Sequence, residues 1–334
     1  MGNIGSQLDI TSAWSGHQAK RSLRADPAIA FLNMLKFSVV SPVSYKARYE
    51  HLQVPLANGG PAEIRVNKYR LRGLPGHDVD EAASKAFFDS LSRHHVDMEL
   101  RVDPGARYFR VLHRNRDSSF AVTEHTETGL EKVGSEFLKQ LSVMARYVFA
   151  GKGAPEHCQL VLQLVNHWKL APDGLQSYAD KSLGLDCNGF VGNFLWHANR
   201  QQSWSNLGLG KHDEGPDVSI DGYFDRRKSI SRWEDLIPGR SYIMGLVDAA
   251  GHVVPGGSAF NAGHIVVTEP GRFRRATLTE PPAVWAVEST AAHEPGLWES
   301  WYSFLNVDRS GIFTIKREEM ITGHQIVKFR IAPV

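Results

Sequence analysis

The segment that most constrains the fold of this chain is Leu185–Val191, which places a cysteine where a helix is predicted to begin. Asp186 is a good residue to cap a helix, and apolar residues then recur at helical spacing as far as Ala198. A cysteine in the first turn lies near the positive end of the helix dipole, so we expect the pKa of the Cys187 thiol to be lowered. Gly189 would let other backbone approach closely. The pattern predicts a nucleophile at the start of a helix.

These residues resemble the Asp-Cys-Ser-Gly-Phe-Val signature of the NlpC/P60 superfamily of papain-like cysteine peptidases and amidases, with Asn188 in place of the serine. Downstream, Gly263–Val267 is similar to the strand that carries the general base in that family. Leu236–Arg240 resembles the family's Leu-x-Pro-Gly-Asp turn, with arginine in place of the aspartate. Tyr178 matches a tyrosine that often precedes the cysteine, and the resemblance covers residues 155–334.

The resemblance implies an α+β, papain-like NlpC/P60 fold in which the nucleophile helix packs on an antiparallel sheet. It also implies Cys187 as nucleophile and His264 as general base. A third polar group should orient His264, and the family places it on the following strand, where Glu288 lies. Glu269 and His293 are the alternatives for this third role.

The oxyanion of such a reaction needs hydrogen-bond donors, and the backbone N–H of Cys187 is one candidate. By resemblance, the Tyr178 hydroxyl is a second. The alternative for Tyr178 is an aromatic side chain that packs on the cysteine helix. Thiol–imidazole hydrolysis requires no cofactor, and we expect none. Asn306–Gly311 begins like a calcium loop, but Arg317 occupies the position of the closing glutamate, which favours a polar turn.

The composition is that of a soluble globular protein. Of 334 residues, 42% are hydrophobic and 22% charged, and the formal net charge is +2, which gives no reason to expect a nucleic-acid partner. The second cysteine, Cys158, adjoins an apolar run and is expected to be a buried hydrophobe. No stretch has the length of a membrane span.

We expect two domains, divided at the glycine-rich segment 151–155. Residues 1–150 are predicted to form a separate α+β domain with a flexible arm at 1–25, and residues 155–334 the hydrolase domain. Hydrophobic periodicity predicts helices near 26–40, 80–91, 128–148 and 158–168, and strands near 98–102, 108–112, 120–122, 241–247, 264–269, 284–288, 312–316 and 325–331.

Three functions are consistent with these motifs. The first is an amidase or endopeptidase that cleaves peptidoglycan stem peptides through a thioester acyl-enzyme. The second is a papain-like effector or acyltransferase acting on host protein or lipid, to which the N-myristoylation pattern of Met1–Ser6 adds weak support. The third is a binding module without catalysis. We find no convincing export signal, so we expect cytoplasmic synthesis followed by a specialised delivery route, with an immunity or secretion partner.

Overall fold

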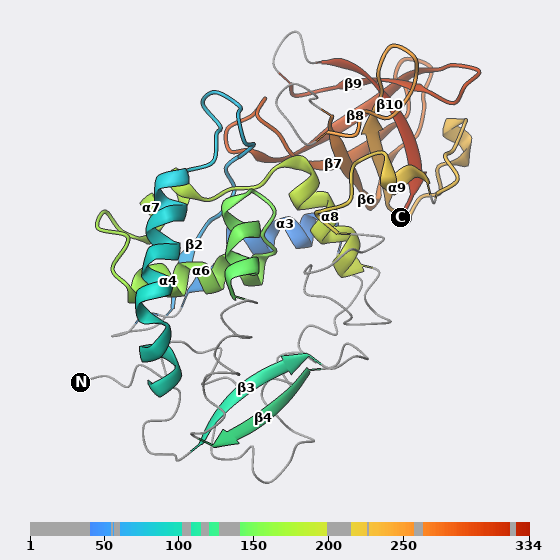
Figure 1. The fold of residues 1–334 in the computed structure, drawn as a ribbon. Coiled ribbons are helices and arrows are strands. Elements are labelled where there is room, and N and C mark those ends of the chain that lie inside the picture. Colours follow the sequence, from blue (N-terminus) through green and yellow to red (C-terminus); the bar gives the residue numbers. More distant parts are fainter. Residues whose placement is uncertain are drawn as a thin grey trace.

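The computed structural model of the chain describes residues 41–54, 56, 61–101, 108–114, 120–126, 141–198, 215–225, 227–256, 263–320 and 325–334, and within 94–140 it describes backbone only. The predicted arm at 1–25 and the predicted helix at 26–40 lie outside these residues. The described chain is a mixture of helices and antiparallel strands (Figure 1), which confirms the α+β class.

Helices dominate the first part of the described chain and strands the last part. The helices are α3 (Pro42–Glu50), α4 (Glu81–Arg101), α6 (Pro155–His167), α7 (Leu175–Ser182), α8 (Cys187–Ala198) and α9 (Gly222–Asp225), with a 3-10 turn η5 (Trp233–Asp235) and a helical segment at 141–149. Helix α3 was not predicted from the sequence. It begins with local signals, because the Ser41 side chain accepts a hydrogen bond from the Ser44 N–H and Pro42 occupies the first turn.

Six antiparallel strands close into a barrel in the C-terminal half. They are β5 (Tyr242–Leu246), β6 (Ile265–Arg274), β7 (Ala283–Ser289), β8 (Leu297–Val307), β9 (Phe313–Arg317) and β10 (Ile326–Pro333). Their order is β10-β5-β6-β7-β8-β9, and β10 closes the barrel by pairing with both β5 and β9. The sequence predicted every one of these strands except β8. Large apolar side chains such as Tyr302, Phe313 and Phe329 form a buried cluster between them.

Two short sheets precede the barrel. Strands β1 (Leu52–Val54) and β2 (Ala62–Ile64) pair antiparallel, as do β3 (Tyr108–Arg114) and β4 (Phe120–Thr126). The strand predicted at 98–102 is wrong, because α4 continues as a helix to Arg101. Alternation over five residues is a short signal, and methionine, glutamate, leucine and arginine are all good helix formers.

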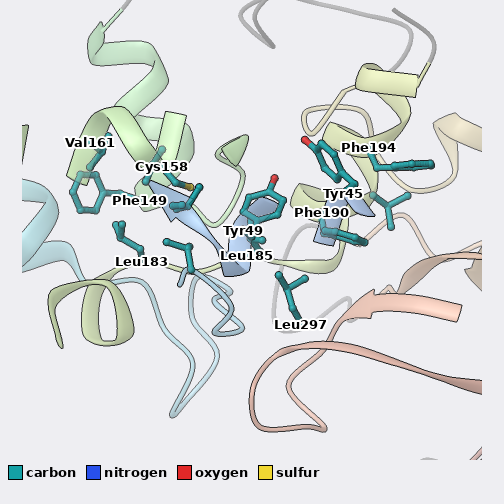
Figure 2. Close-up of a cluster of buried hydrophobic side chains, with 14 of the residues drawn as sticks. Tyr45, Tyr49, Phe149, Cys158, Val161, Leu183, Leu185, Phe190, Phe194 and Leu297 are labelled. Carbon is teal, nitrogen blue, oxygen red and sulfur yellow. The ribbon is translucent and has the colours of Figure 1, made fainter. Parts of the chain in front are cut away.

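Helices α3 and α8 lie between the barrel and the other helices (Figure 1), and both contact β6 and β7. A single buried hydrophobic cluster joins these elements (Figure 2), and it takes residues from both sides of the boundary predicted at 151–155, including Tyr49, Phe149, Cys158, Leu185, Phe190 and Leu297. This packing does not support a separate core for the described part of residues 1–150. Among the described residues, no helix combines the length and apolar character needed to cross a membrane.

Candidate active site

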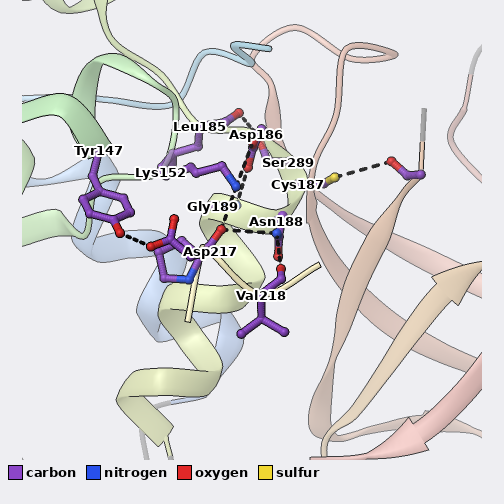
Figure 3. A network of polar contacts seen from close by, with 12 residues as sticks. Tyr147, Lys152, Leu185, Asp186, Cys187, Asn188, Gly189, Asp217, Val218 and Ser289 are labelled. Carbon is purple, nitrogen blue, oxygen red and sulfur yellow. Dashed lines mark hydrogen bonds and ion pairs between the residues drawn. The ribbon is translucent and has the colours of Figure 1, made fainter. Parts of the chain in front are cut away.

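Helix α8 begins at Cys187, and Asp186 caps it as predicted. The Asp186 carboxylate accepts a hydrogen bond from the Gly189 N–H, and its carbonyl accepts one from the Phe190 N–H at 3.1 Å. The Asp186 N–H in turn donates to the carbonyl of Gly151 at 2.8 Å. Figure 3 shows this cap beside the cysteine. These hydrogen bonds of Asp186 hold the first turn of α8 in place, and they therefore fix the position of the Cys187 side chain.

Asn188, which stands where the family signature has serine, binds a neighbouring segment (Figure 3). Its amide nitrogen donates to the carbonyl of Val218 at 2.7 Å and to that of Pro216 at 3.3 Å. Its amide oxygen accepts a hydrogen bond from the Tyr223 hydroxyl at 2.9 Å. Lys152 holds the same segment, because its Nζ lies 2.6 Å from the Pro216 carbonyl. Asn188, in the position of that serine, thus binds residues 216–218 to the first turn of α8.

The sulfur of Cys187 lies against the backbone on both sides of His264. The Sγ is 3.8 Å from the carbonyl oxygen of Gly263, and the nearby backbone N–H of Ile265 acts to lower the pKa of the thiol. His264 stands between these two residues, immediately before β6. The fold therefore brings the predicted nucleophile and the predicted base into one site, although they are far apart in the sequence.

Glu288 on β7 lies within hydrogen-bond reach of His264, as expected. The distance from His264 Nε2 to Glu288 Oε2 is 2.5 Å, and the Glu288 side chain is fully buried while that of His264 is 15% exposed. Because Glu288 engages Nε2, Nδ1 is the ring nitrogen that remains for another partner. The alternatives have other partners: Glu269 accepts from the Val43 N–H at 2.9 Å, and His293 contacts the Glu319 carbonyl at 2.6 Å.

Two residues that the sequence analysis did not select complete the surroundings of Glu288. The Tyr302 hydroxyl, on β8, donates to Oε1 at 2.6 Å. Arg317, at the end of β9, places Nη2 at 3.0 Å from Oε1 and 2.8 Å from Oε2. Burial alone would raise the pKa of Glu288, but the Arg317 charge, the contact with His264 and the Tyr302 hydroxyl together lower it to about 2. Glu288 is therefore ionised at neutral pH.

This lowered pKa makes a prediction about acid stability. An acid whose pKa falls on folding stabilises the folded state above its unfolded pKa, near 4.5, and loses that contribution as pH falls toward 2. For Glu288 the contribution is about 3 kcal/mol. We expect urea unfolding to show a steeper loss of the free energy of unfolding below pH 5 in the wild type than in Glu288→Gln. Glu294→Gln, which changes an exposed glutamate, serves as the surface control. Equal slopes for the wild type and Glu288→Gln would contradict the lowered pKa of Glu288.

The expected lowering of the Cys187 thiol pKa is wrong. Burial, followed by the charge of Asp186, raises this pKa to about 12, although the N–H groups of Ile265 and Asn188 and the charge of Lys152 act in the opposite direction. The helix start does supply N–H groups. However, the residue is only 5% exposed, and the same cap that starts the helix sets a carboxylate beside the sulfur. Cys187 is thus a neutral thiol at neutral pH.

The tyrosine near the nucleophile is Tyr69 rather than Tyr178. Burial raises the pKa of Tyr69, and its nearness to the Asp186 and Glu288 carboxylates and to the Cys187 side chain raises it further. Its backbone forms a bridge with Leu185, two residues before the cysteine. No local signal in the sequence connects Tyr69 with the site.

Tyr178 lies on α7, and its surroundings do not match the role that the family resemblance implies for it. Burial and then the charge of Asp80 raise its pKa, and within the described part of the chain its hydroxyl has no hydrogen-bond partner. No described contact ties it to Cys187. It packs instead against the buried hydrophobic cluster.

A pair of matched substitutions separates the two tyrosines. We expect Tyr69→Phe to lower kcat/KM by roughly 10²-fold, the loss typical for one hydrogen-bond donor to an oxyanion, and Tyr178→Phe to leave it unchanged. Thermal unfolding of both variants would show whether folding is affected. The opposite ranking, with Tyr178→Phe the more damaging, would return the role to Tyr178.

The described residues contain no group of three or more His, Cys, Asp or Glu side chains placed to hold a metal ion. No family model matches the chain, and searches of curated proteins and of solved structures find no similar protein. The likeness to the NlpC/P60 superfamily therefore depends on the motifs of the sequence alone.

Proposed function

We propose that this protein is a cysteine hydrolase that cleaves amide bonds, with Cys187 as nucleophile, His264 as general base and Glu288 as the group that orients the histidine. One observation carries the proposal. The Cys187 sulfur lies close to both backbone neighbours of His264, while the Nε2 of that histidine contacts a fully buried carboxylate. A thiol, an imidazole and a carboxylate arranged in series are the components of a catalytic triad.

The raised thiol pKa indicates how the first step would proceed. His264 Nδ1 would take the proton from Cys187 as Sγ attacks the amide carbon, because a thiol with a pKa of about 12 forms little thiolate on its own. The imidazolium would be stabilised by ionised Glu288 and would then give its proton to the leaving amine. Water would hydrolyse the resulting thioester by the same base, which regenerates the thiol.

The resemblance to NlpC/P60 proteins points to a peptide bond in peptidoglycan stem peptides as substrate. The packing of α8 on β6 and β7 is compatible with the papain-like fold of that superfamily, in which the nucleophile helix lies on an antiparallel sheet. The closed barrel is an additional feature of this chain beyond that expectation. Both the fold family and the substrate class are part of the proposal.

Incubation of the purified full-length chain with a mixture of muropeptides, followed by mass spectrometry, tests the proposal. We expect pairs of fragments whose masses add up to that of the substrate plus one water, one fragment with a new amine and the other with a new carboxyl group. Cys187→Ala should give none of them. Products in which the acyl part of a cleaved muropeptide is joined to a different amine, with release of the original amine, would favour an acyltransferase instead. A complete absence of Cys187-dependent products from muropeptides and from general peptide libraries would contradict hydrolysis.

A further inference from the structure

Arg317 lies beside Glu288 and is held there by two different contacts. Its Nη2 lies 3.0 Å and 2.8 Å from the two carboxylate oxygens of Glu288, and its side chain is only 6% exposed. Its guanidinium carbon lies 5.6 Å from the centre of the Tyr302 ring, and Arg317 and Tyr302 are directly paired across β8 and β9. The arginine is thus fixed between an aromatic face and the carboxylate that contacts His264.

Stability alone does not account for this arrangement. Burying two charges costs desolvation energy that their attraction seldom exceeds, and apolar packing usually stabilises a core as well or better. The other side chains of the barrel core are mainly apolar, including Phe304, Phe313 and Phe329. An ion pair inserted among them, in contact with the histidine of a candidate active site, is explained better by what it does to that histidine.

We propose that Arg317 is a positioning residue, which keeps the Glu288 carboxylate ionised and in place so that His264 carries its proton on Nε2 and presents Nδ1 to Cys187. This inference rests on the proposed function, because it assigns a role within the same site. None of the described contacts of Arg317 is with the Cys187 thiol.

The groups that face Glu288 explain why the arginine matters. They are His264 before β6, Tyr302 on β8 and Arg317 on β9, with Tyr69 at longer range. Arg317 is the member of this set that is positively charged at every working pH. Without it, burial would favour the neutral carboxyl, which donates a hydrogen bond instead of accepting one. A proton donated to Nε2 would leave the ring proton on Nδ1, where it blocks transfer from the thiol.

Arg317→Met tests this role through the tautomer of His264. With ¹⁵N-labelled histidine in the full-length protein, long-range ¹H–¹⁵N spectra distinguish the two neutral forms, and His264→Gln assigns the signals. We expect the wild type to hold the Nε2–H form and Arg317→Met to gain the Nδ1–H form. We also expect the acidic limb of the kcat/KM profile to move upward by at least one pH unit. An unchanged tautomer and an unchanged acidic limb in Arg317→Met would overturn the proposal.

Three further variants separate positioning from folding. Arg317→Lys retains the charge and should restore the wild-type tautomer. Arg274→Met removes another arginine–glutamate pair of the barrel, that with Glu318, and should change neither the tautomer nor the acidic limb. If Arg317→Met fails to fold, Glu288→Gln with Arg317→Met removes both buried charges together. This double variant should match Glu288→Gln in its pH profile, because Arg317 acts through Glu288, and a further change would overturn the proposal.

The two proposals can fail separately. The expected tautomer change with no hydrolysis by the wild type would leave the positioning role standing and reject the proposed function. Cys187-dependent hydrolysis with a tautomer that does not respond to Arg317→Met would reject the positioning role and leave the function standing.

Discussion

Replacing Cys187 with alanine is expected to abolish hydrolysis, with a loss on the order of 10⁵- to 10⁶-fold in kcat. The sulfur is the only group in the proposed mechanism that bonds to the substrate, and neither His264 nor Glu288 can substitute for it. Folding should be retained, because alanine keeps the helical backbone and the hydrogen bonds of Asp186 at the start of α8 do not involve the sulfur. Product formation from muropeptides, measured beside thermal unfolding, would show both effects.

The second cysteine provides a matched control. Cys158 is fully buried, and burial raises its pKa well above the ordinary value, so Cys158→Ala should reduce stability while leaving turnover per folded molecule unchanged. We expect His264→Ala to be as inactive as Cys187→Ala, and the double variant to be no worse than either, because members of one catalytic unit fail together. If Cys187→Ala retained wild-type turnover, Cys187 could not be the nucleophile.

Gly189→Ala is expected to cause a large loss of stability from a single added methyl group, about 3 kcal/mol or more. A Cβ at this position would lie 2.9 Å from the Asp186 carboxylate and 3.0 Å from the Cα of Lys152, and closer still to the Gly151 carbonyl oxygen. Backbone atoms form most of this surrounding, so side-chain movement cannot relieve the clash. The free energy of unfolding from denaturant titration measures the effect.

Gly222→Ala is the appropriate comparison for that experiment. An added Cβ there would lie 3.0 Å from Cγ1 of Val218 and 3.3 Å from Oγ of Ser219, both side-chain atoms that can shift. We expect a loss of at most about 1 kcal/mol, since small-to-large changes cost less where neighbours can adjust. Equal losses for the two variants would show that the close approach at Gly189 is relieved at little cost.

Local sequence determined the parts of the site that depend on neighbouring residues. The cap of α8 followed from Asp186 because a carboxylate three residues before an N–H can bind it in any protein. The pairing of His264 with Glu288 was anticipated from the family resemblance, which implies a third group on the strand after the histidine, and the structure places His264 just before β6 and Glu288 on the neighbouring β7. Most barrel strands were likewise visible in the alternation of apolar residues.

Tertiary structure decided the electrostatics, because burial and long-range contact are not properties of any short segment. The thiol pKa of Cys187 follows from the desolvation of the sulfur, which outweighs the effect of the helix start. Tyr69 and Arg317 reach the site from distant parts of the described chain, one through a backbone bridge to Leu185 and the other from β9, which is separated from β7 by β8 alone. The sequence alone thus indicated the candidate nucleophile, base and carboxylate, whereas their protonation depends on charges and apolar surfaces that only the folded chain brings together.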